Sequence, residues 1–166
     1  MKKEVCVITG GGSGMGLAAA KYMPKEKIIL VTGRTLAKLE RAVTELQEAG
    51  YEAYAKTCDT SVRSQVQELA AYAAELGEIK NVIHAAGLSP AMADPEKLLR
   101  VNALGTVYIN QEFSKYMKAG SVIVDISSNS AYMIPGFLAK KKTFTLADTD
   151  EDLFLKKCLK LPKMLK

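Results

Sequence analysis

The chain has 166 residues, of which 48% are hydrophobic and 25% charged, as expected for one globular domain with its own core. It has no run of about 18 apolar residues to span a membrane and no signal peptide at its start, so we expect a cytoplasmic protein without membrane contacts. Much of the net charge of +5 lies in lysines of 140–142 and 156–166, without the interleaved aromatic residues typical of nucleic-acid binding. Three cysteines without C-x-x-C spacing and a single histidine argue against a metal site.

Short apolar runs alternate with longer segments of helical periodicity along the first 126 residues. The runs predicted to be strands are 5–9, 27–32, 52–57, 81–84 and 121–126. Three of them are continuously apolar rather than alternating, which is typical of strands covered by helices on both faces. The alternation of strand and helix therefore predicts an α/β fold, with a Rossmann-like, doubly wound parallel sheet.

The segments between the predicted strands carry helix-period apolar residues with clear stop and start signals. We predict helices over 35–49, ended by Gly50, and over 61–76, ended by Gly77. A third begins at Pro95, a residue suited to the first helical position, and runs toward Met117. The chain thus forms one domain, residues 1–130, without an internal linker or repeat.

After Asn129 the composition changes. Residues 133–142 contain a proline, a glycine and three lysines, and we predict a loop there. Acidic residues at 148–152 then favour a helix start, and an amphipathic helix follows until Pro162. A basic amphipathic helix could lie on a membrane surface, but a lid packed on the domain is the favoured interpretation of residues 131–166.

The glycine-rich segment 9–16, Thr-Gly-Gly-Gly-Ser-Gly-Met-Gly, lies between the first predicted strand and the first helix. Glycines there allow positive φ and let backbone amides approach a phosphate, and the helix N-terminus adds unpaired amides and partial positive charge. A Walker A loop is excluded because Leu17 stands where that motif requires lysine. The segment therefore predicts a dinucleotide site rather than an ATPase or GTPase.

The spacing Thr-Gly-x-x-x-Gly-x-Gly resembles the fingerprint of short-chain dehydrogenases/reductases. Four further matches occur in the family's order: Cys58-Asp59, His84-Ala85-Ala86-Gly87, Val101-Asn102 and Ile126-Ser127-Ser128. The resemblance covers about residues 4–130 and implies the N-terminal five strands of that family's fold. It departs from the family at His84 and Ala85, where two asparagines are usual. We interpret His84 as a strand-end residue without a catalytic duty.

The resemblance also implies roles for individual residues. Ser128 would hold the substrate oxygen, and Asn102 would anchor a proton-relay water. The implied cofactor-binding residues are Thr9, Gly10, Gly12, Ser13, Gly14, Met15, Gly16, Arg34, Thr35, Asp59, Thr60, Ala85, Ala86 and Gly87.

The end of the second predicted strand bears on the choice of nicotinamide cofactor. An NAD enzyme places a carboxylate there to bind the 2′-hydroxyl. This chain instead has Thr32-Gly33-Arg34-Thr35, with no carboxylate. A guanidinium can bind a 2′-phosphate through a charge-assisted, bidentate contact. The sequence therefore favours NADP(H) over NAD(H).

In the resembled family, a tyrosine transfers the proton and a lysine four residues later lowers its pKa. None of the seven tyrosines here has a lysine at that offset. We therefore expect an NADP(H)-dependent oxidoreductase, interconverting an alcohol and a carbonyl, that is present as an incomplete chain. A non-catalytic NADPH-binding module or sensor is the alternative, and a nucleic-acid-binding protein is the third hypothesis.

The fifth predicted strand, 121–126, has no further strand after it in the chain given. Its apolar edge and face would lie uncovered, which predicts an association surface. The expected partners are thus a nicotinamide dinucleotide, a small alcohol or carbonyl substrate, and further copies of the chain.

Overall fold

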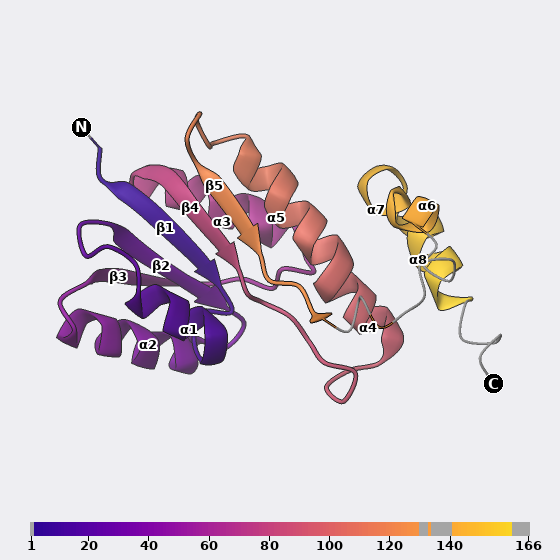
Figure 1. Cartoon of the computed structure of the whole chain (residues 1–166), viewed down its shortest axis with the longest axis horizontal. Helices are drawn as coiled ribbons and strands as arrows, with labels where there is room; N and C mark the ends of the chain where they lie inside the picture. The colour runs from indigo at the N-terminus through magenta and orange to yellow at the C-terminus, as the bar shows by residue number, and fades with distance from the viewer. Residues whose placement is uncertain (1, 130–132, 134–140, 161–166) are drawn as a thin grey trace.

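The computed structural model describes residues 2–129, 133 and 141–160. Five parallel strands form one sheet in the order β3-β2-β1-β4-β5 (Figure 1). The strands are β1 (Glu4–Thr9), β2 (Ile28–Gly33), β3 (Glu52–Thr57), β4 (Glu78–His84) and β5 (Val122–Asp125). The chain moves outward from β1 to β3 and then crosses back to β4, so the strand order reverses between β1 and β4. This arrangement confirms the predicted doubly wound α/β fold.

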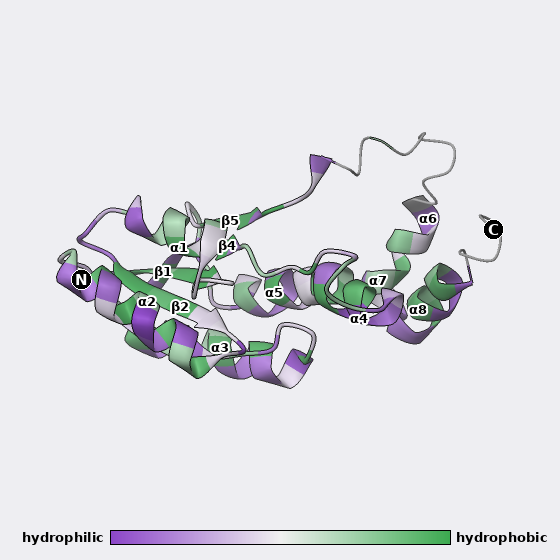
Figure 2. Ribbon diagram, turned by 90° about the horizontal axis from the view of Figure 1, so that it is seen from below, coloured by the Kyte–Doolittle hydropathy of each residue, from purple (hydrophilic) through white to green (hydrophobic). Residues whose placement is uncertain are grey.

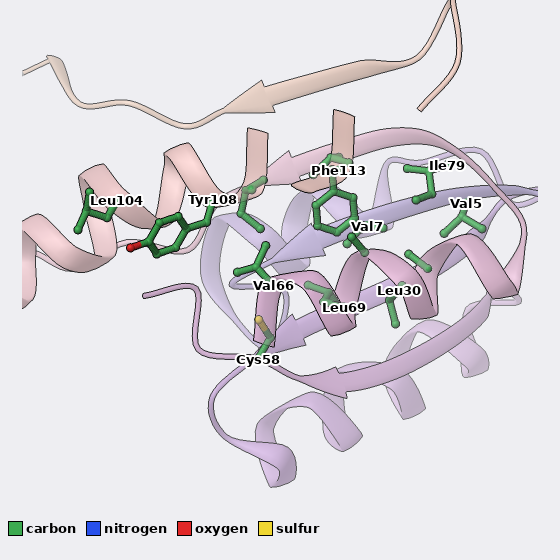
Figure 3. Close-up of a cluster of buried hydrophobic side chains, with 14 of the residues drawn as sticks. Val5, Val7, Leu30, Cys58, Val66, Leu69, Ile79, Leu104, Tyr108 and Phe113 are labelled. Atoms are coloured by element: carbon green, nitrogen blue, oxygen red, sulfur yellow. The ribbon is translucent and has the colours of Figure 1, made fainter. Parts of the chain in front are cut away.

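Helices cover both faces of the sheet because buried strand residues alternate between two cores. Cys6 and Ile8 of β1 pack with α1 (Gly14–Lys21) and α2 (Leu36–Glu48). Val5 and Val7 face the opposite side, toward α3 (Arg63–Leu76) and α5 (Gly105–Ser114). Figure 3 shows the second core, in which Phe113 of α5 lies over Val7. In Figure 2 the hydrophobic strands lie between helices that carry hydrophilic residues.

The predicted helix boundaries largely agree with the structure. Gly50 has φ 87° after the end of α2, and Gly77 follows α3. Asp94 caps α4 (Pro95–Leu99), its side chain accepting a hydrogen bond from the Lys97 amide at 3.0 Å. Strand β4 starts at Glu78, earlier than predicted, and Lys80 is the extra residue where its pairing with β1 shifts register.

The long helix that begins at Pro95 contains a π-helical segment that the sequence did not predict. This segment, η1 (Arg100–Leu104), connects α4 to α5, and α5 ends at Ser114 rather than near Met117. A π-helical turn inserts one residue into the i→i+4 ladder and is frequent at functional sites. Here it contains Asn102.

The predicted loop 133–142 extends too far. Lys141 and Lys142 belong to a short helix, α6 (Lys141–Phe144), because lysine has good helix propensity. Residues 134–140 of the predicted loop lie outside the described part of the chain. A second short helix, α7 (Leu146–Thr149), precedes α8 (Glu151–Leu159), whose first turn Asp150 caps by accepting from the Leu153 amide. Pro162, the predicted end of the helix, is also outside the described residues.

The C-terminal helices pack on the domain rather than standing apart from it. Phe154, Leu155 and Cys158 of α8 are buried and belong to the hydrophobic cluster that contains residues of α3 and α5, and α8 itself lies against α4. A charged network adds to this contact, because the Arg63 guanidinium lies 2.9 Å from Glu112 Oε1 and 3.1 Å from Glu151 Oε1.

Strand β5 is an edge of the sheet, as its position in the order requires. Val122, Val124 and Ile126 are each about half exposed, at 51%, 47% and 45%. The expected uncovered apolar strand is therefore present.

Candidate cofactor site

A cavity of about 250 Å³ opens at the carboxyl ends of the strands, where the strand order reverses. Crevices at this point bind ligands in open α/β sheets, because loops from both sides diverge there. Segments after β1, β2, β3 and β4 all contribute to the wall. Its lining is Gly10, Ser13, Met15, Gly16, Gly33, Arg34, Cys58, Asp59, Thr60, Ala85, Ala86, Gly87, Leu88 and Val101.

Most of the predicted cofactor-binding residues are therefore brought together around one cavity. Thr9, Gly12 and Thr35 are not part of its lining. Thr9 is fully buried behind the wall, and Gly12 faces Leu39 and Lys38 of α2. Thr35 is exposed at the start of α2. Gly14 also lies outside the lining, although its neighbours Ser13 and Met15 belong to it.

The glycine segment is shaped by close backbone contacts. Gly10 has φ 65°, and a Cβ there would lie 2.9 Å from the Ala85 carbonyl oxygen, which no side chain tolerates. Gly14 has φ 57° but open space where a Cβ would project. The segment leads into the N-terminus of α1, so glycine backbone at Gly10 and Gly16 lies in the cavity wall beside the start of this helix.

Arg34 contributes the positive charge of the lining. Among the described residues no carboxylate forms an ion pair with it, so the guanidinium is available to an anion. The carboxylate in the lining, Asp59, accepts hydrogen bonds from the amide and hydroxyl of Ser61 at 3.0 and 2.6 Å. It shapes the turn that follows β3.

Two lining residues fix the floor of the cavity. Burial raises the pKa of the Cys58 thiol to about 12, so this side chain is a protonated, apolar surface rather than a nucleophile. Thr60 is buried against Gly105, where a Cβ would lie 3.2 Å from the Thr60 carbonyl oxygen. Leu88 and Val101 also line the cavity, although they were not among the predicted cofactor-binding residues. Each is adjacent in sequence to a motif residue, Gly87 or Asn102, and this adjacency could have identified them.

Asn102 does not line the cavity, and its side chain is engaged with the loop after β4. Its Oδ1 accepts from the Leu88 amide at 2.8 Å, and its Nδ2 donates to the Leu88 carbonyl at 2.8 Å. Its own carbonyl accepts from the Thr106 hydroxyl at 3.0 Å. The side-chain amide thus positions the wall segment that ends at Leu88.

Ser128 lies beyond the end of β5, and its side chain is exposed. It is not part of the cavity lining. The backbone leading to it stays beside β4, because the Ile126 amide donates to the His84 carbonyl at 3.0 Å.

His84, which we interpreted as a residue without a catalytic duty, is buried at the end of β4. Its Nδ1 lies 2.7 Å from the Thr9 hydroxyl oxygen, which in turn accepts from the Ala86 amide at 3.1 Å. Burial lowers the pKa of the imidazole below its usual value, against a smaller opposing effect of Asp125.

Two negative findings apply to the residues that the structure describes. No group of three or more histidine, cysteine or acidic side chains is placed to hold a metal ion. In the same part of the chain, every helix is too short or too polar to cross a membrane.

A family comparison matches residues 4–139 to the short chain dehydrogenases. Among curated proteins, a short-chain dehydrogenase/reductase, bsc3, of Alternaria brassicicola is 31% identical over 134 residues, which are 81% of this chain and 48% of that protein. The chain therefore spans about half the length of this relative.

Solved structures show the same likeness. A citronellol catabolism dehydrogenase of Pseudomonas aeruginosa PAO1 superposes with a TM-score of 0.70 at 30% identity, covering 80% of this chain and 59% of the other. An actinorhodin polyketide ketoreductase with NADPH gives 0.68 at 27% identity, with coverages of 87% and 60%. An NAD⁺-bound xylitol dehydrogenase gives 0.71 at 25% identity, with coverages of 80% and 55%.

Proposed function

Because the chain belongs to the short-chain dehydrogenase/reductase family, we propose that it forms the NADP(H)-binding part of an oxidoreductase that interconverts an alcohol and a carbonyl compound. The observation that carries this proposal is the cavity at the strand-order reversal, walled by the glycine segment and by Ala85–Leu88. The names of the relatives, which are dehydrogenases and reductases, favour an enzyme over a non-catalytic binding module.

The residues present fit a nicotinamide dinucleotide. A Cβ at Gly10 or Gly16 would collide with backbone, so the segment stays free of side chains where a pyrophosphate needs to approach amides. When bound, the nicotinamide supplies or accepts a hydride. The chain's own residues then bind and orient: the amides near α1 hold phosphate, and the Ala85–Leu88 wall lies against the rest of the cofactor.

The preference for the 2′-phosphorylated form depends on Arg34. Structures similar to this chain include one with NADPH and one with NAD⁺, so the likeness leaves the choice open. Arg34 lines the cavity, has no carboxylate partner among the described residues, and follows a strand end without an acidic residue. A bidentate contact between guanidinium and phosphate favours NADP(H) by about 1.5–3 kcal/mol.

Ser128 and Asn102 take different parts in this proposal. Ser128, exposed after β5, would hold the substrate oxygen through its hydroxyl. Asn102 would act indirectly, because its side-chain amide fixes the backbone of Leu88 and its π-helical segment sets the local backbone. Residues 1–130 would form the cofactor domain, and 131–166 the first part of a segment over the substrate.

Dinucleotide binding is tested by calorimetry with NADPH on two valine variants. Gly14→Val places a branched side chain beside the phosphate-binding amides, and we expect binding to disappear. Gly120→Val is the matched control, because Gly120 also has positive φ, at 83°, and open space around it, but lies before β5 and away from the cavity. It reports the effect of backbone strain alone. Equal affinity in both variants and the unmodified chain would contradict the proposed site.

A further inference from the structure

His84 is separated from the cavity by two hydrogen bonds. The imidazole, 3% exposed, contacts the Thr9 hydroxyl through Nδ1, and that hydroxyl accepts from the amide of Ala86, a residue of the wall. Its other nitrogen, Nε2, is buried and has no hydrogen-bond partner among the described residues. The arrangement connects the ends of β1 and β4 at the level of the site.

The contact with Thr9 is compatible with a neutral ring, and the surroundings of Nε2 oppose a charged one. A hydroxyl can donate to an unprotonated Nδ1 or accept from a protonated one, so both neutral tautomers keep the bond. A second proton would place a charged N–H at Nε2, where it lacks an acceptor. The charged group near the ring is Asp125 of β5, whose Cα pairs with that of His84 and whose carboxylate accepts from Asn110 of α5 at 2.9 Å. The facing side chain from β1 is the uncharged Thr9.

We infer that His84 is a positioning residue, which in its neutral form fixes the Thr9 hydroxyl and, through it, the Ala86 amide in the cavity wall. Protonation of the ring would favour movement of the imidazole toward water and would release this amide. The wall would then loosen in acid. The effect on dinucleotide affinity rests on the proposed function, whereas the effect on the Ala86 amide does not.

The first test uses the unmodified chain. His84 is its one histidine, so a single imidazole Hε1 signal reports the ring's titration by NMR without assignment. We expect a pKa below the value of about 6.5 for an unperturbed histidine. Because the folded-state pKa is lowered, the stabilising effect of the neutral ring is present above about 6.5 and is lost as the pH falls toward the folded-state pKa. A pKa at or above 6.5 would overturn the inference.

The second test compares three variants by hydrogen exchange of the Ala86 amide at pH 7. His84→Leu removes both ring nitrogens, and we expect exchange to accelerate about tenfold or more. His84→Asn keeps a polar group near Thr9 and should show a smaller effect. Thr32→Val is the matched control: Thr32 pairs with Thr9 across the strands and is equally buried, but its hydroxyl has no partner among the described residues. Unchanged exchange in His84→Leu would contradict the inference.

Calorimetry with NADPH between pH 5 and 7 completes the experiment. Affinity of the unmodified chain should fall with decreasing pH more steeply than that of His84→Asn, since titration of the 2′-phosphate is common to both. If the NADPH affinities of the two proteins fall in parallel with decreasing pH, His84 does not position the cavity wall for the ligand. Absence of binding in every variant and in the unmodified chain would reject the proposed function, and the Ala86 exchange rates would still decide the role of His84.

Discussion

The side-chain amide of Asn102 and the backbone of Leu88 form a reciprocal pair of hydrogen bonds, 2.8 Å in each direction. The pair joins the π-helical segment to the loop that leaves β4. Since both the donor and the acceptor of the amide are used, the geometry of the cavity wall depends on the identity of this residue.

Replacing Asn102 by aspartate is the most specific test of that pair. The carboxylate can still accept from the Leu88 amide, but it can no longer donate, and it faces the Leu88 carbonyl oxygen. We expect a loss of about 1–3 kcal/mol in the free energy of unfolding at pH 7. Urea denaturation measures this loss of stability. Asn110→Asp makes the same substitution in α5, where the side chain contacts Asp125 at an exposed position, and its free energy of unfolding is the value for comparison. Equal stability of Asn102→Asp and the unmodified chain would show that the pair contributes little.

The charge of Arg34 should determine the cofactor preference. We expect NADPH to bind at least about tenfold more tightly than NADH, and Arg34→Asp to narrow or reverse the ratio. Arg41→Asp makes the same charge change at an exposed position of α2 outside the cavity and should leave the ratio unchanged. Calorimetry with both dinucleotides checks the prediction. Equal affinities in the unmodified chain would reject it.

Glu112 should make stability depend on pH in the acid range. Burial disfavours its charged form, but the hydrogen bonds from Lys115 and Arg63 prevail, and the pKa of the carboxyl is lowered. A lowered folded-state pKa contributes stability that is present above the unfolded value of about 4.3 and is lost as the pH falls through the folded-state pKa. Glu112→Gln should therefore destabilise the chain by about 1–3 kcal/mol at pH 7. Thermal unfolding at pH 7 and pH 3 should show this difference shrinking in acid; a difference independent of pH would contradict the assignment.

Docking of α8 should depend on Phe154, a fully buried residue of this helix in the hydrophobic cluster that also contains residues of α3 and α5. Phe154→Ala removes most of that packing and should cost about 3–5 kcal/mol locally. Hydrogen exchange is expected to accelerate in α8 while β1 and β4 stay protected. Phe144→Ala, on the more exposed ring that contacts Phe154 edge-on with centroids 5.8 Å apart, should have a smaller effect. Unaltered protection of α8 in Phe154→Ala would show that the polar contacts of Glu151 with Arg63 and Tyr108 suffice to hold the helix.

The exposed edge strand β5 predicts self-association of the chain as given. Val124→Lys places a charge on the half-exposed apolar face and should shift the chain toward monomer in sedimentation velocity runs. Tyr22→Lys, at an exposed apolar residue after α1, serves as the control and should leave association unchanged. A monomeric unmodified chain would exclude β5 as an association surface.

The sequence was most informative where local patterns and packing agree. Continuous apolar runs predicted buried strands such as β2, and the glycines of 9–16 predicted a turn between a strand and a helix, because both depend on residues close in sequence. The π-helical segment was not predicted, because one inserted residue hardly changes helical periodicity. The pairing of Asn102 with Leu88 was missed for a different reason: it depends on tertiary placement of two segments. The helices α6 and α7 were missed because each has four residues, too few for a helical period to show in the sequence.

The strand order also sets the sequence in which the molecule can assemble. Strands β1, β2 and β3 are neighbours along the chain, whereas β4 joins β1 only after Glu4 pairs with Glu78 across three intervening helices. Contacts between distant segments form slowly, since the loop between them must first close. Ala85–Leu88 and Val101 of the cavity wall follow β4, so a growing polypeptide can fold its first three strands before the pocket is complete. In a refolding experiment, dinucleotide binding should accordingly appear later than the pairing of β1, β2 and β3.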